Sequence, residues 1–411
     1  MVIGLCLFTL CTLVSIKMSS MNILTRYREA TNLEQDPESL RFNADEKFTI
    51  IQFADLHYGE SSSMDNRSTG VMLDILKIEN EVDFAVLSGD QISGFARWHN
   101  KDRFMLWISS LVPTVNNGIP FATIMGNHDD QPYYFDPVWW FKRVLVVAVV
   151  FPAMVLVTCF LTDWKRFFVS TNTQVLLVIV VAALVWSLYE LAPSTHMRES
   201  LLRYEKSQFP TLSRTALGPP SLPGVSNFYI PVFSSTGSQK VLLFFLDSGG
   251  GRLQETIYSS QTEWVHSVSS QYGNPHAIAF FHIPSDEFKN AVDKFDCVGQ
   301  NQTEPPATLP PSSRLSVTDS LAAAGVRAVF VGHDHRNSWC CIPKTRSDHF
   351  DMASLCYGRH TGYGGYGDWL RGARIIQLKF DASSRFTINT WLRLENGEQE
   401  PQGQIFPFAH V

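Results

Sequence analysis

Five short clusters of Asp, Asn and His residues are notable because each directly follows an apolar stretch typical of a buried β-strand. In α/β sheets, ligands and catalytic groups collect at the carboxyl ends of strands. Oxygen atoms of Asp and Asn, together with neutral imidazole nitrogens, suit Fe, Mn, Zn and similar metals. In chain order the clusters are Asp55-x-His57, Gly89-Asp90, Gly126-Asn127-His128-Asp129-Asp130, His282 and Gly332-His333-x-His335.

Each cluster alone is a weak indication of a metal site, since Gly-Asn-His also suits a plain turn. The spacing adds weight. Residues i and i+2 of a strand point the same way, so Asp55 and His57 can approach one ion together, and His333 and His335 can do likewise. The whole set offers more ligands than one ion needs and therefore predicts two. Two metals can clamp the attacking and leaving oxygens of a phosphoryl transfer and activate a bound water.

The elements that must position these clusters alternate along the first part of the chain. Strands are expected at 47–53, 84–87 and 119–125, with helices at 71–78 and 103–111 between them. This alternation predicts an α/β layer architecture. Later in the chain, strands are expected at 241–246, 277–281, 328–331, 374–380 and 386–394, and helices at 261–271 and 317–324.

Composition sets further bounds. The 411 residues are 45% hydrophobic and 12% aromatic, which is enough for a substantial core in one or two domains. The net charge is -6 and there is no long Lys/Arg run, so no nucleic-acid-binding surface is expected. Four of the seven cysteines lie in polar surroundings and form no C-x-x-C pair, which argues against a zinc ribbon. In a secreted chain some of them would form disulfides, with the pairing left open; they are Cys297, Cys340, Cys341 and Cys356.

Residues 1–20 predict a signal peptide or a signal anchor. The apolar run at 2–16 is too short for a comfortable membrane span, and the basic residues follow it rather than precede it. Two sequons, Asn66-Arg67-Ser68 and Asn301-Gln302-Thr303, fit a glycoprotein. We therefore expect a protein in a membrane or on the secretory or extracellular side.

An apolar insert at 143–191 interrupts the α/β pattern. Residues 143–161 are nearly uncharged and long enough to span hydrocarbon, and membrane helices tolerate a proline such as Pro152. A polar link at 162–174 leads to a second apolar run at 175–189. Together they predict a transmembrane hairpin that returns the chain to the side it left. The alternatives are a pair of buried core helices, or sequence foreign to the domain, such as a mis-spliced gene model.

The order D-x-H, G-D, G-N-H-D, H, G-H-x-H resembles the calcineurin-like metallophosphoesterase superfamily. The surrounding words resemble its short purple-acid-phosphatase-related group; they are Ala54-Asp55-Leu56-His57-Tyr58, Gly126-Asn127-His128-Asp129-Asp130, Phe245-Leu246-Asp247-Ser248-Gly249-Gly250, Gly332-His333-Asp334-His335 and Cys356-Tyr357-Gly358. The resemblance covers about residues 45–140 and 195–395. It implies a four-layer α/β/β/α sandwich with a dimetal site at the carboxyl edge of the sheets. We expect this domain over 45–395, interrupted by the hairpin, and a tail at 396–411.

The resemblance also implies a role for each site residue. The implied ligands of the first metal are Asp55, His57 and His335, those of the second are Asn127, His282 and His333, and Asp90 bridges both. His128 would lie beside the metals, where it stabilises charge on the phosphoryl oxygens or protonates the leaving group. Asp129 would orient His128, as a carboxylate can do for an imidazole.

Two positions depart from purple acid phosphatases proper. Those enzymes carry a Tyr three residues after the bridging Asp, where this chain has Ser93, and a Gly where this chain has His57. We therefore expect no purple colour and a pair of divalent or mixed-valence ions drawn from Fe, Mn and Zn. Relatives without the Tyr are sometimes labelled inactive, but His57 restores a ligand, so we expect activity.

The expected function is a metal-dependent phosphoesterase that hydrolyses phosphate monoesters by in-line attack of a metal-bound hydroxide. One alternative is a phosphodiesterase acting on nucleotides or lipid headgroups. The other is a catalytically silent, membrane-anchored binding protein. The expected partners are a phosphorylated small molecule or phosphoprotein and a membrane, since the hairpin would hold the active-site edge near a bilayer. The sequence leaves the oligomeric state open.

Overall fold

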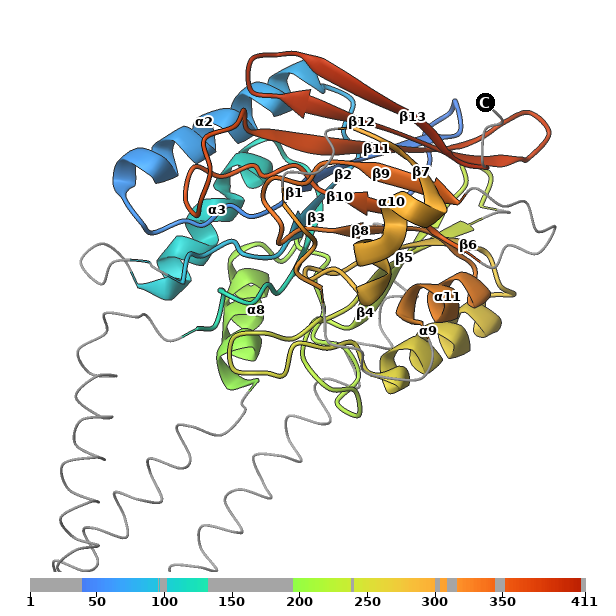
Figure 1. Ribbon diagram of the computed structural model, residues 1–411, viewed down its shortest axis with the longest axis horizontal. Helices are drawn as coiled ribbons and strands as arrows, with labels where there is room; N and C mark the ends of the chain where they lie inside the picture. Colours follow the sequence, from blue (N-terminus) through green and yellow to red (C-terminus); the bar gives the residue numbers. More distant parts are fainter. Residues whose placement is uncertain are drawn as a thin grey trace, which may run out of the picture.

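The computed structural model describes residues 39–94, 96, 102–131, 195–237, 240–299, 304–308, 316–343 and 352–407. In this part of the chain two β-sheets lie face to face, and helices cover their outer faces (Figure 1). The predicted α/β architecture with two sheets is therefore confirmed. The predicted signal segment at 1–20 and the predicted hairpin at 143–191 lie outside the described residues. Among the helices that are described, none is both long and apolar enough to cross a membrane.

The first sheet supplies three of the strands that end at predicted site residues. In spatial order its strands are β13 (Gln399–Phe406), β12 (Phe386–Leu394), β11 (Gly372–Phe380), β1 (Lys47–Phe53), β2 (Phe84–Ser88) and β3 (Phe121–Ile124). β1, β2 and β3 run parallel, so their carboxyl ends meet at one edge. β11 pairs antiparallel with β1, and β12 and β13 extend the sheet antiparallel.

The second sheet supplies the other two site-bearing strands, β6 and β8. In spatial order its strands are β4 (Phe228–Phe233), β5 (Lys240–Phe245), β6 (His276–Phe280), β8 (Val326–Val331), β10 (Ser354–Tyr357), β9 (Cys340–Pro343) and β7 (Phe295–Val298). The central strands β5, β6, β8 and β10 run parallel. The strands at both edges pair antiparallel, so the parallel part lies inside the sheet.

The helices divide between the two outer faces, as Figure 1 shows. The first sheet is covered by α2 (Ser62–Ile78), α3 (Arg103–Asn116) and α8 (His196–Gln208). The second is covered by α9 (Ser259–Gln271), the 3-10 helix η3 (Asp286–Asn290), α10 (Ala291–Lys294) and α11 (Val317–Ala323). The side chains of Ser61, Asp102 and Ser316 accept backbone hydrogen bonds at the starts of α2, α3 and α11, which explains where these helices begin.

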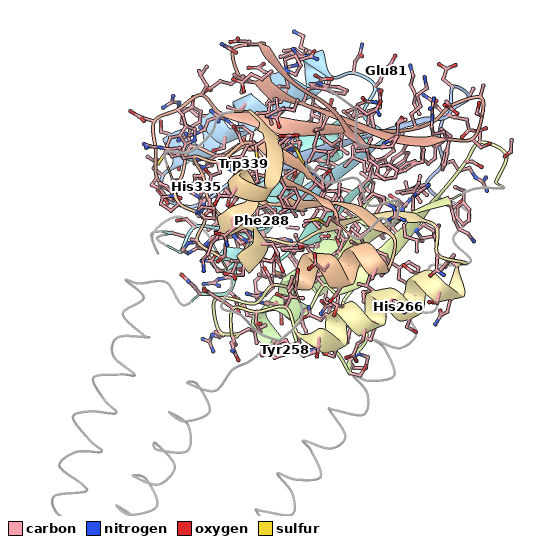
Figure 2. The ribbon with its side chains drawn as sticks, turned by 45° about the vertical axis from the view of Figure 1, so that its right-hand side comes forward. Glu81, Tyr258, His266, Phe288, His335 and Trp339 are labelled. Carbon is pink, nitrogen blue, oxygen red and sulfur yellow. A yellow bond between two sulfur atoms is a disulfide. The ribbon has the colours of Figure 1, made fainter. Side chains whose placement is uncertain are left out.

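Side-chain alternation along the strands builds a core on each face of each sheet. In β1, Phe48 and Ile50 pack between the sheets, whereas Ile51 and Phe53 pack against the helices. β5 alternates in the same way between the inter-sheet layer and its own helices. On the helix side of the second sheet, the ring of Phe288 lies 5.7 Å from that of Trp339, and both residues are labelled in Figure 2. The four layers follow from this pattern.

Several elements lie outside the predicted set: β4, β7, β9, β10, β13 and α8. β4 contains Pro231, and β13 contains Pro401 and Gly403, residues that normally argue against a strand. Both strands lie at sheet edges, where a missing N–H costs no ladder bond. The predicted tail at 396–411 is therefore corrected, because β13 pairs with β12 and belongs to the first sheet.

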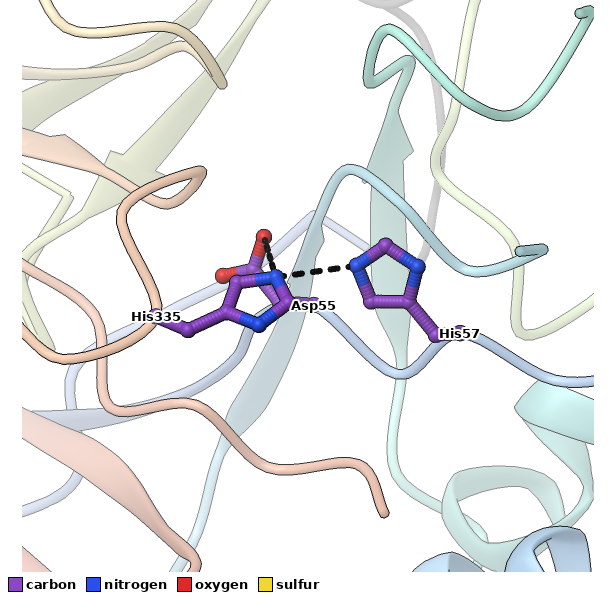
Figure 3. A group of neighbouring side chains, drawn as sticks. All are labelled: Asp55, His57 and His335. Carbon is purple, nitrogen blue, oxygen red and sulfur yellow. Dashed lines mark hydrogen bonds and ion pairs between the residues drawn. The ribbon is translucent and has the colours of Figure 1, made fainter. Parts of the chain in front are cut away.

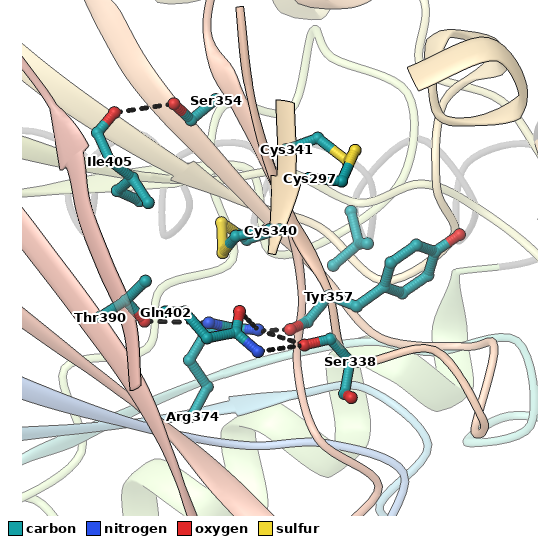
Figure 4. The surroundings of a disulfide bond; sticks show 12 residues. Cys297, Ser338, Cys340, Cys341, Ser354, Tyr357, Arg374, Thr390, Gln402 and Ile405 are labelled. Carbon is teal, nitrogen blue, oxygen red and sulfur yellow. Dashed lines mark hydrogen bonds between the residues drawn. A yellow bond between two sulfur atoms is a disulfide. The ribbon is translucent and has the colours of Figure 1, made fainter. Parts of the chain in front are cut away.

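Two disulfides tie the edge of the second sheet together, and they join the four cysteines that the sequence singles out. Cys297 in β7 pairs with Cys341 in β9, and Cys340 pairs with Cys356 in β10 (Figure 4). Disulfides persist in oxidising compartments, so the bonds agree with the expected secretory location.

The Cys297–Cys341 bond closes a sequence separation of 44 residues. Loop-closure entropy then predicts that the Cys297→Ser/Cys341→Ser variant loses about 4 kcal/mol of unfolding free energy. Urea denaturation of the oxidised variant and the oxidised parent would measure the difference. After reduction, the unfolding free energies of the variant and the parent should be nearly equal. An oxidised variant as stable as the oxidised parent would show that this bond contributes nothing.

Candidate metal site

The predicted clusters meet where the carboxyl ends of the parallel strands from both sheets face one another. From the first sheet come Asp55 after β1, Asp90 after β2 and Asn127 after β3. From the second come His282 after β6, and His333 and His335 after β8. The resulting cluster is nearly closed to solvent, with the side chains of Asp55, Asp90 and His282 fully or almost fully buried. The structure therefore brings together residues separated by up to 280 positions in the sequence.

Four of these residues adopt left-handed backbone conformations. The φ angles are 57° at Asp55, 49° at His57, 53° at Asp90 and 76° at His333. A non-glycine residue in this region costs roughly 1–2 kcal/mol, and such strain is typical of functional sites. The expectation that strand alternation aligns Asp55 with His57 is thus wrong in its mechanism: both residues follow β1, and two left-handed turns aim their side chains.

The first group consists of Asp55, His57 and His335, whose ligand atoms all lie within 4.8 Å of one another. Figure 3 shows the three side chains converging, with His57 Nε2 3.0 Å from His335 Nε2 and His335 Nε2 3.8 Å from Asp55 Oδ1. Two imidazole nitrogens and a carboxylate that face one point form a donor set that suits a divalent cation such as Zn²⁺, Mn²⁺ or Fe²⁺.

The second group contains Asp90, His282 and His333, again within 4.8 Å of one another. Asn127 completes it, because its Oδ1 lies 3.1 Å from His282 Nε2 and 3.0 Å from His333 Nδ1. His333 and His335 therefore face different groups, and the expectation that alternation directs them to one ion is wrong. The two groups match the ligand sets implied by the resemblance. Metal binding by these residues stays a prediction.

Asp90 lies between the two groups. Its Oδ2 is 3.6 Å from His57 Nε2 in the first group and 3.1 Å from His282 Nε2 in the second. His128 Nε2 lies 3.8 Å from the same oxygen. Burial alone would raise the pKa of Asp90, but His282 and His128 hold it well below the ordinary value. An ionised carboxylate at this position is able to contact two cations at once.

Glycines let these elements approach one another. A Cβ atom on Gly126 would lie 2.1 Å from Asp90 Oδ1, and a Cβ atom on Gly89 would lie 2.4 Å from His282 Nδ1. Gly89 also has a φ of 98°, which favours glycine. Gly126 therefore makes room for a ligand after the neighbouring strand β2, and Gly89 makes room for a ligand from the other sheet.

Backbone carbonyls fix the orientation of two imidazoles. His282 Nδ1 lies 2.9 Å from the carbonyl oxygen of Ser88, and His335 Nδ1 lies 3.2 Å from that of Tyr366. When Nδ1–H donates to these oxygens, Nε2 has a free lone pair directed at the cluster. Metal-binding histidines characteristically have this second contact, so the arrangement fits the proposed ions.

The electrostatics of the cluster also favour a bound cation. Burial raises the pKa of Asp55 to about 8. Burial alone would lower the pKa of His282, but Asp90 raises it to about 10. Burial lowers the pKa values of His333 and His335 to about 3, so both rings are neutral ligands at pH 7. Without a cation, protonation of Asp55 removes a buried negative charge, and protonation of His282 places a positive charge beside Asp90.

His128 lies at the open side of the cluster, with 26% of its side chain exposed. Its Nδ1 is 3.0 Å from Gln131 Oε1, which leaves Nε2 directed toward Asp90. The predicted orienting role of Asp129 differs from what the structure shows. Asp129 accepts backbone hydrogen bonds from Asp90, Ile92 and Gly126, so it braces two ligand loops while Gln131 contacts His128.

Three residues near the cluster are outside the predicted set. Tyr366 stacks on His335 with 4.1 Å between ring centroids, and His360 lies on the same imidazole at 3.9 Å. Arg198, in α8, contacts the loops that carry Asn127 and Asp130. No local spacing marks these contacts, because each joins segments that only tertiary folding brings together. Arg198, Leu201, Leu202 and Glu205 do show the i, i+3, i+4, i+7 pattern of a buried helix face.

Comparison with known proteins shows what the chain is similar to. A family model described as calcineurin-like phosphoesterase matches residues 48–178. Residues 48–178 are therefore similar to the calcineurin-like phosphoesterase family, and the predicted resemblance to purple-acid-phosphatase-like proteins is confirmed.

Individual relatives place the chain more closely. It is 26% identical over 395 residues to the "Probable inactive purple acid phosphatase 28" of Arabidopsis thaliana, covering 87% of this chain and 83% of the relative. It is 24% identical over 398 residues to "Phosphatase DCR2" of Saccharomyces cerevisiae, covering 89% of this chain and 56% of the relative. Among solved structures, purple acid phosphatase PPD1 from yellow lupin seeds aligns at 10% identity with a TM-score of 0.44, covering 86% of this chain and 53% of that one.

The protonated state of the cluster predicts a pH dependence of metal binding. Metal binding at pH 7 must displace protons from Asp55 and His282, since their pKa values in the cation-free protein are about 8 and about 10. Affinity for Mn²⁺ or Zn²⁺ should therefore rise at least about tenfold per pH unit between pH 6 and 7.5. Calorimetric titration in buffers of different ionisation enthalpy would count the released protons. Binding that releases none would contradict the proposed ligands.

Proposed function

We propose that this protein is a metal-dependent phosphatase that hydrolyses phosphate monoesters at a dinuclear centre. The observation that carries the proposal is the pair of buried donor groups joined by Asp90, whose Oδ2 faces His57 of one group and His282 of the other. A pair of ions is the arrangement that favours phosphoryl transfer, because it stabilises both the attacking and the leaving oxygen. The family match and the relative named a phosphatase support the same chemistry.

The site residues would form two sets of metal ligands. Asp55, His57 and His335 would hold one ion, and Asn127, His282 and His333 the other, with Asp90 shared. Bound there, Fe, Mn or Zn ions would supply Lewis acidity toward a phosphoryl oxygen and lower the pKa of a coordinated water. Burial of the donors excludes bulk water, which strengthens every electrostatic contact in the site.

His128 is suited to act on the substrate itself. Its side chain is 26% exposed, and its ring lies 5.3 Å from that of His57. The contact with Gln131 fixes Nδ1, so Nε2 is available either to donate to a phosphoryl oxygen or to protonate the leaving group. Such proton transfer typically contributes 10²–10⁴-fold to a rate.

A complete ligand set supports activity in spite of the relative named probable inactive. Ser93, which stands where purple acid phosphatases proper carry a Tyr, is buried, and its hydroxyl donates to Glu60 at 2.5 Å. In that contact the Ser93 hydroxyl is directed at Glu60. Because this position carries no Tyr, we expect a colourless enzyme. His57 adds an imidazole to the first group, so the loss of the Tyr leaves the site with enough donors.

We further propose that the protein works in the secretory pathway or on the extracellular side, at a membrane. The two disulfides support an oxidising compartment. Asn66 of the first sequon is exposed on α2, which supports glycosylation there. The substrate would be a phosphorylated small molecule or phosphoprotein, since an anionic phosphate suits a site that would hold two cations.

Hydrolysis of a chromogenic aryl phosphate monoester and the matching diester by the purified full chain, with added Mn²⁺, Zn²⁺ or Fe²⁺, tests the proposal. We expect faster turnover of the monoester. Asp90→Asn should reduce turnover by roughly 10²-fold or more, because the shared carboxylate charge is lost. Faster turnover of the diester would favour a phosphodiesterase instead.

His128→Gln is the matched variant, because it alters chemistry without removing a proposed ligand. It should retain the metal content of the parent while lowering turnover by roughly 10²-fold or more. Elemental analysis of the same samples separates the two effects. A folded parent that turns over neither ester with any metal would leave a binding protein as the better description.

A further inference from the structure

We infer that Arg198 is a positioning residue for the second metal group, holding Asn127 in place through the peptide groups of the two loops beside it. The inference rests on the proposed metal site. Arg198 lies in the first turn of α8. Its side chain is 0% exposed, so none of its contacts is screened by water.

Two buried carboxylates pair with the guanidinium. Arg198 Nη1 donates to Asp247 Oδ1 at 2.6 Å, and Nη2 donates to Asp130 Oδ1 at 3.0 Å. Asp130 ends the G-N-H-D-D motif, and Asp247 begins the D-S-G-G-G motif after β5. A single side chain therefore joins two motifs that lie more than 110 residues apart in sequence.

The same Nη2 also reaches three backbone carbonyls. It lies 3.0 Å from the oxygen of Gly126, 3.2 Å from that of Gly249 and 2.9 Å from that of Gly250. The Gly126 carbonyl belongs to the peptide group that precedes Asn127, so this contact sets the plane from which the Asn127 side chain departs. The planar fork of arginine suits such divergent acceptors, whereas a lysine ammonium acts as a point charge.

The two loops are in direct contact beneath the arginine. A Cβ atom on Gly250 would lie 2.3 Å from Asn127 Cβ, and one on Gly251 would lie 2.0 Å from Asp130 Oδ1. The D-S-G-G-G loop thus packs against the back of Asn127, whose Oδ1 faces His282 and His333. By holding both loops, Arg198 keeps that surface against Asn127.

A second buried residue anchors the helix that presents Arg198. Glu205 lies two turns further along α8 and accepts hydrogen bonds from Trp107 at 2.9 Å and Thr123 at 2.8 Å. Thr123 is in β3, the strand that leads to Asn127. Figure 1 shows α8 beside β3 and α3. Arg198 and Glu205 therefore fix both ends of the buried face of α8 relative to β3, the strand that leads to Asn127.

The charge of Arg198 is secure in this setting. Burial alone would lower its pKa, but Asp247 and Asp130 raise it above the ordinary value. The positive charge of Arg198 therefore pairs with Asp130 and Asp247. It does not neutralise the carboxylates of the proposed metal ligands. Its role is thus to fix geometry, and it touches none of the proposed ligand atoms in the contacts described above.

The test compares Mn²⁺ binding by the purified full chain with binding by Arg198→Lys, which keeps the charge but loses the fork. We expect the Mn²⁺ affinity of the second group to fall about 10–100-fold, as for other residues that orient metal ligands. At a Mn²⁺ concentration that fills both sites of the parent, the variant should hold one ion. Its electron paramagnetic resonance spectrum should change from that of a coupled pair to that of an isolated ion.

Arg374→Lys is the matched control. Arg374 is also 0% exposed, and it donates to Tyr357, Ser338, Thr390 and Gln402, as Figure 4 shows. Its loss should lower the melting temperature as a buried arginine does, yet leave two coupled Mn²⁺ ions bound. A purely structural role for Arg198 would make the two variants alike.

Two coupled ions in Arg198→Lys, with parental affinities, would overturn the inference. If Arg198→Lys fails to fold, Asp247→Asn replaces it in the test, because it keeps the shape of the side chain. We expect Asp247→Asn to lose one ion in the same selective way. Binding of two ions by Asp247→Asn with the affinities of the parent would overturn the inference. A parent that binds no pair of ions defeats the proposed function and the inference together. A parent with two ions and an unaffected variant defeats the inference alone.

Discussion

The site depends on burying acidic side chains together with neutral imidazoles, where water cannot solvate their charge. Asp90 is ionised in this interior, and in the cation-free protein Asp55 and His282 hold protons at pH 7. Divalent cations can replace those protons and meet the same need for positive charge. Every other feature of the site, from the turns after the strands to the second contacts of the histidines, serves to keep these groups close together.

Rigid strands and strained turns achieve that closeness. The ligands come from two sheets, so the site exists only after the sheets have packed, and the inter-sheet core therefore supports function directly. Left-handed conformations at Asp55, His57, Asp90 and His333 turn the side chains inward just beyond the strands. Their combined cost of several kcal/mol is tolerated because the surrounding hydrogen bonds and packing determine the backbone path.

Much of this arrangement could be predicted from the sequence, because buried parallel strands are continuous apolar runs and the site residues follow them directly. The strand at 47–53 and the one at 386–394 agree with β1 and β12 in both bounds. Local patterns fail where tertiary contacts decide. Pro231 and Pro401 conceal edge strands, the alternation rule does not apply beyond the end of β1, and nothing in the sequence near Asn127 indicates that Arg198 will hold its loop.

We propose that the two buried groups bind a pair of ions that share Asp90. Crystals of the protein grown with Mn²⁺, measured for anomalous scattering, would test it most directly. Two peaks are expected roughly 3.5–4 Å apart, one beside Asp55, His57 and His335 and the other beside Asn127, His282 and His333. A protein that is folded and saturated with Mn²⁺ but shows no peak within this cluster would contradict the account.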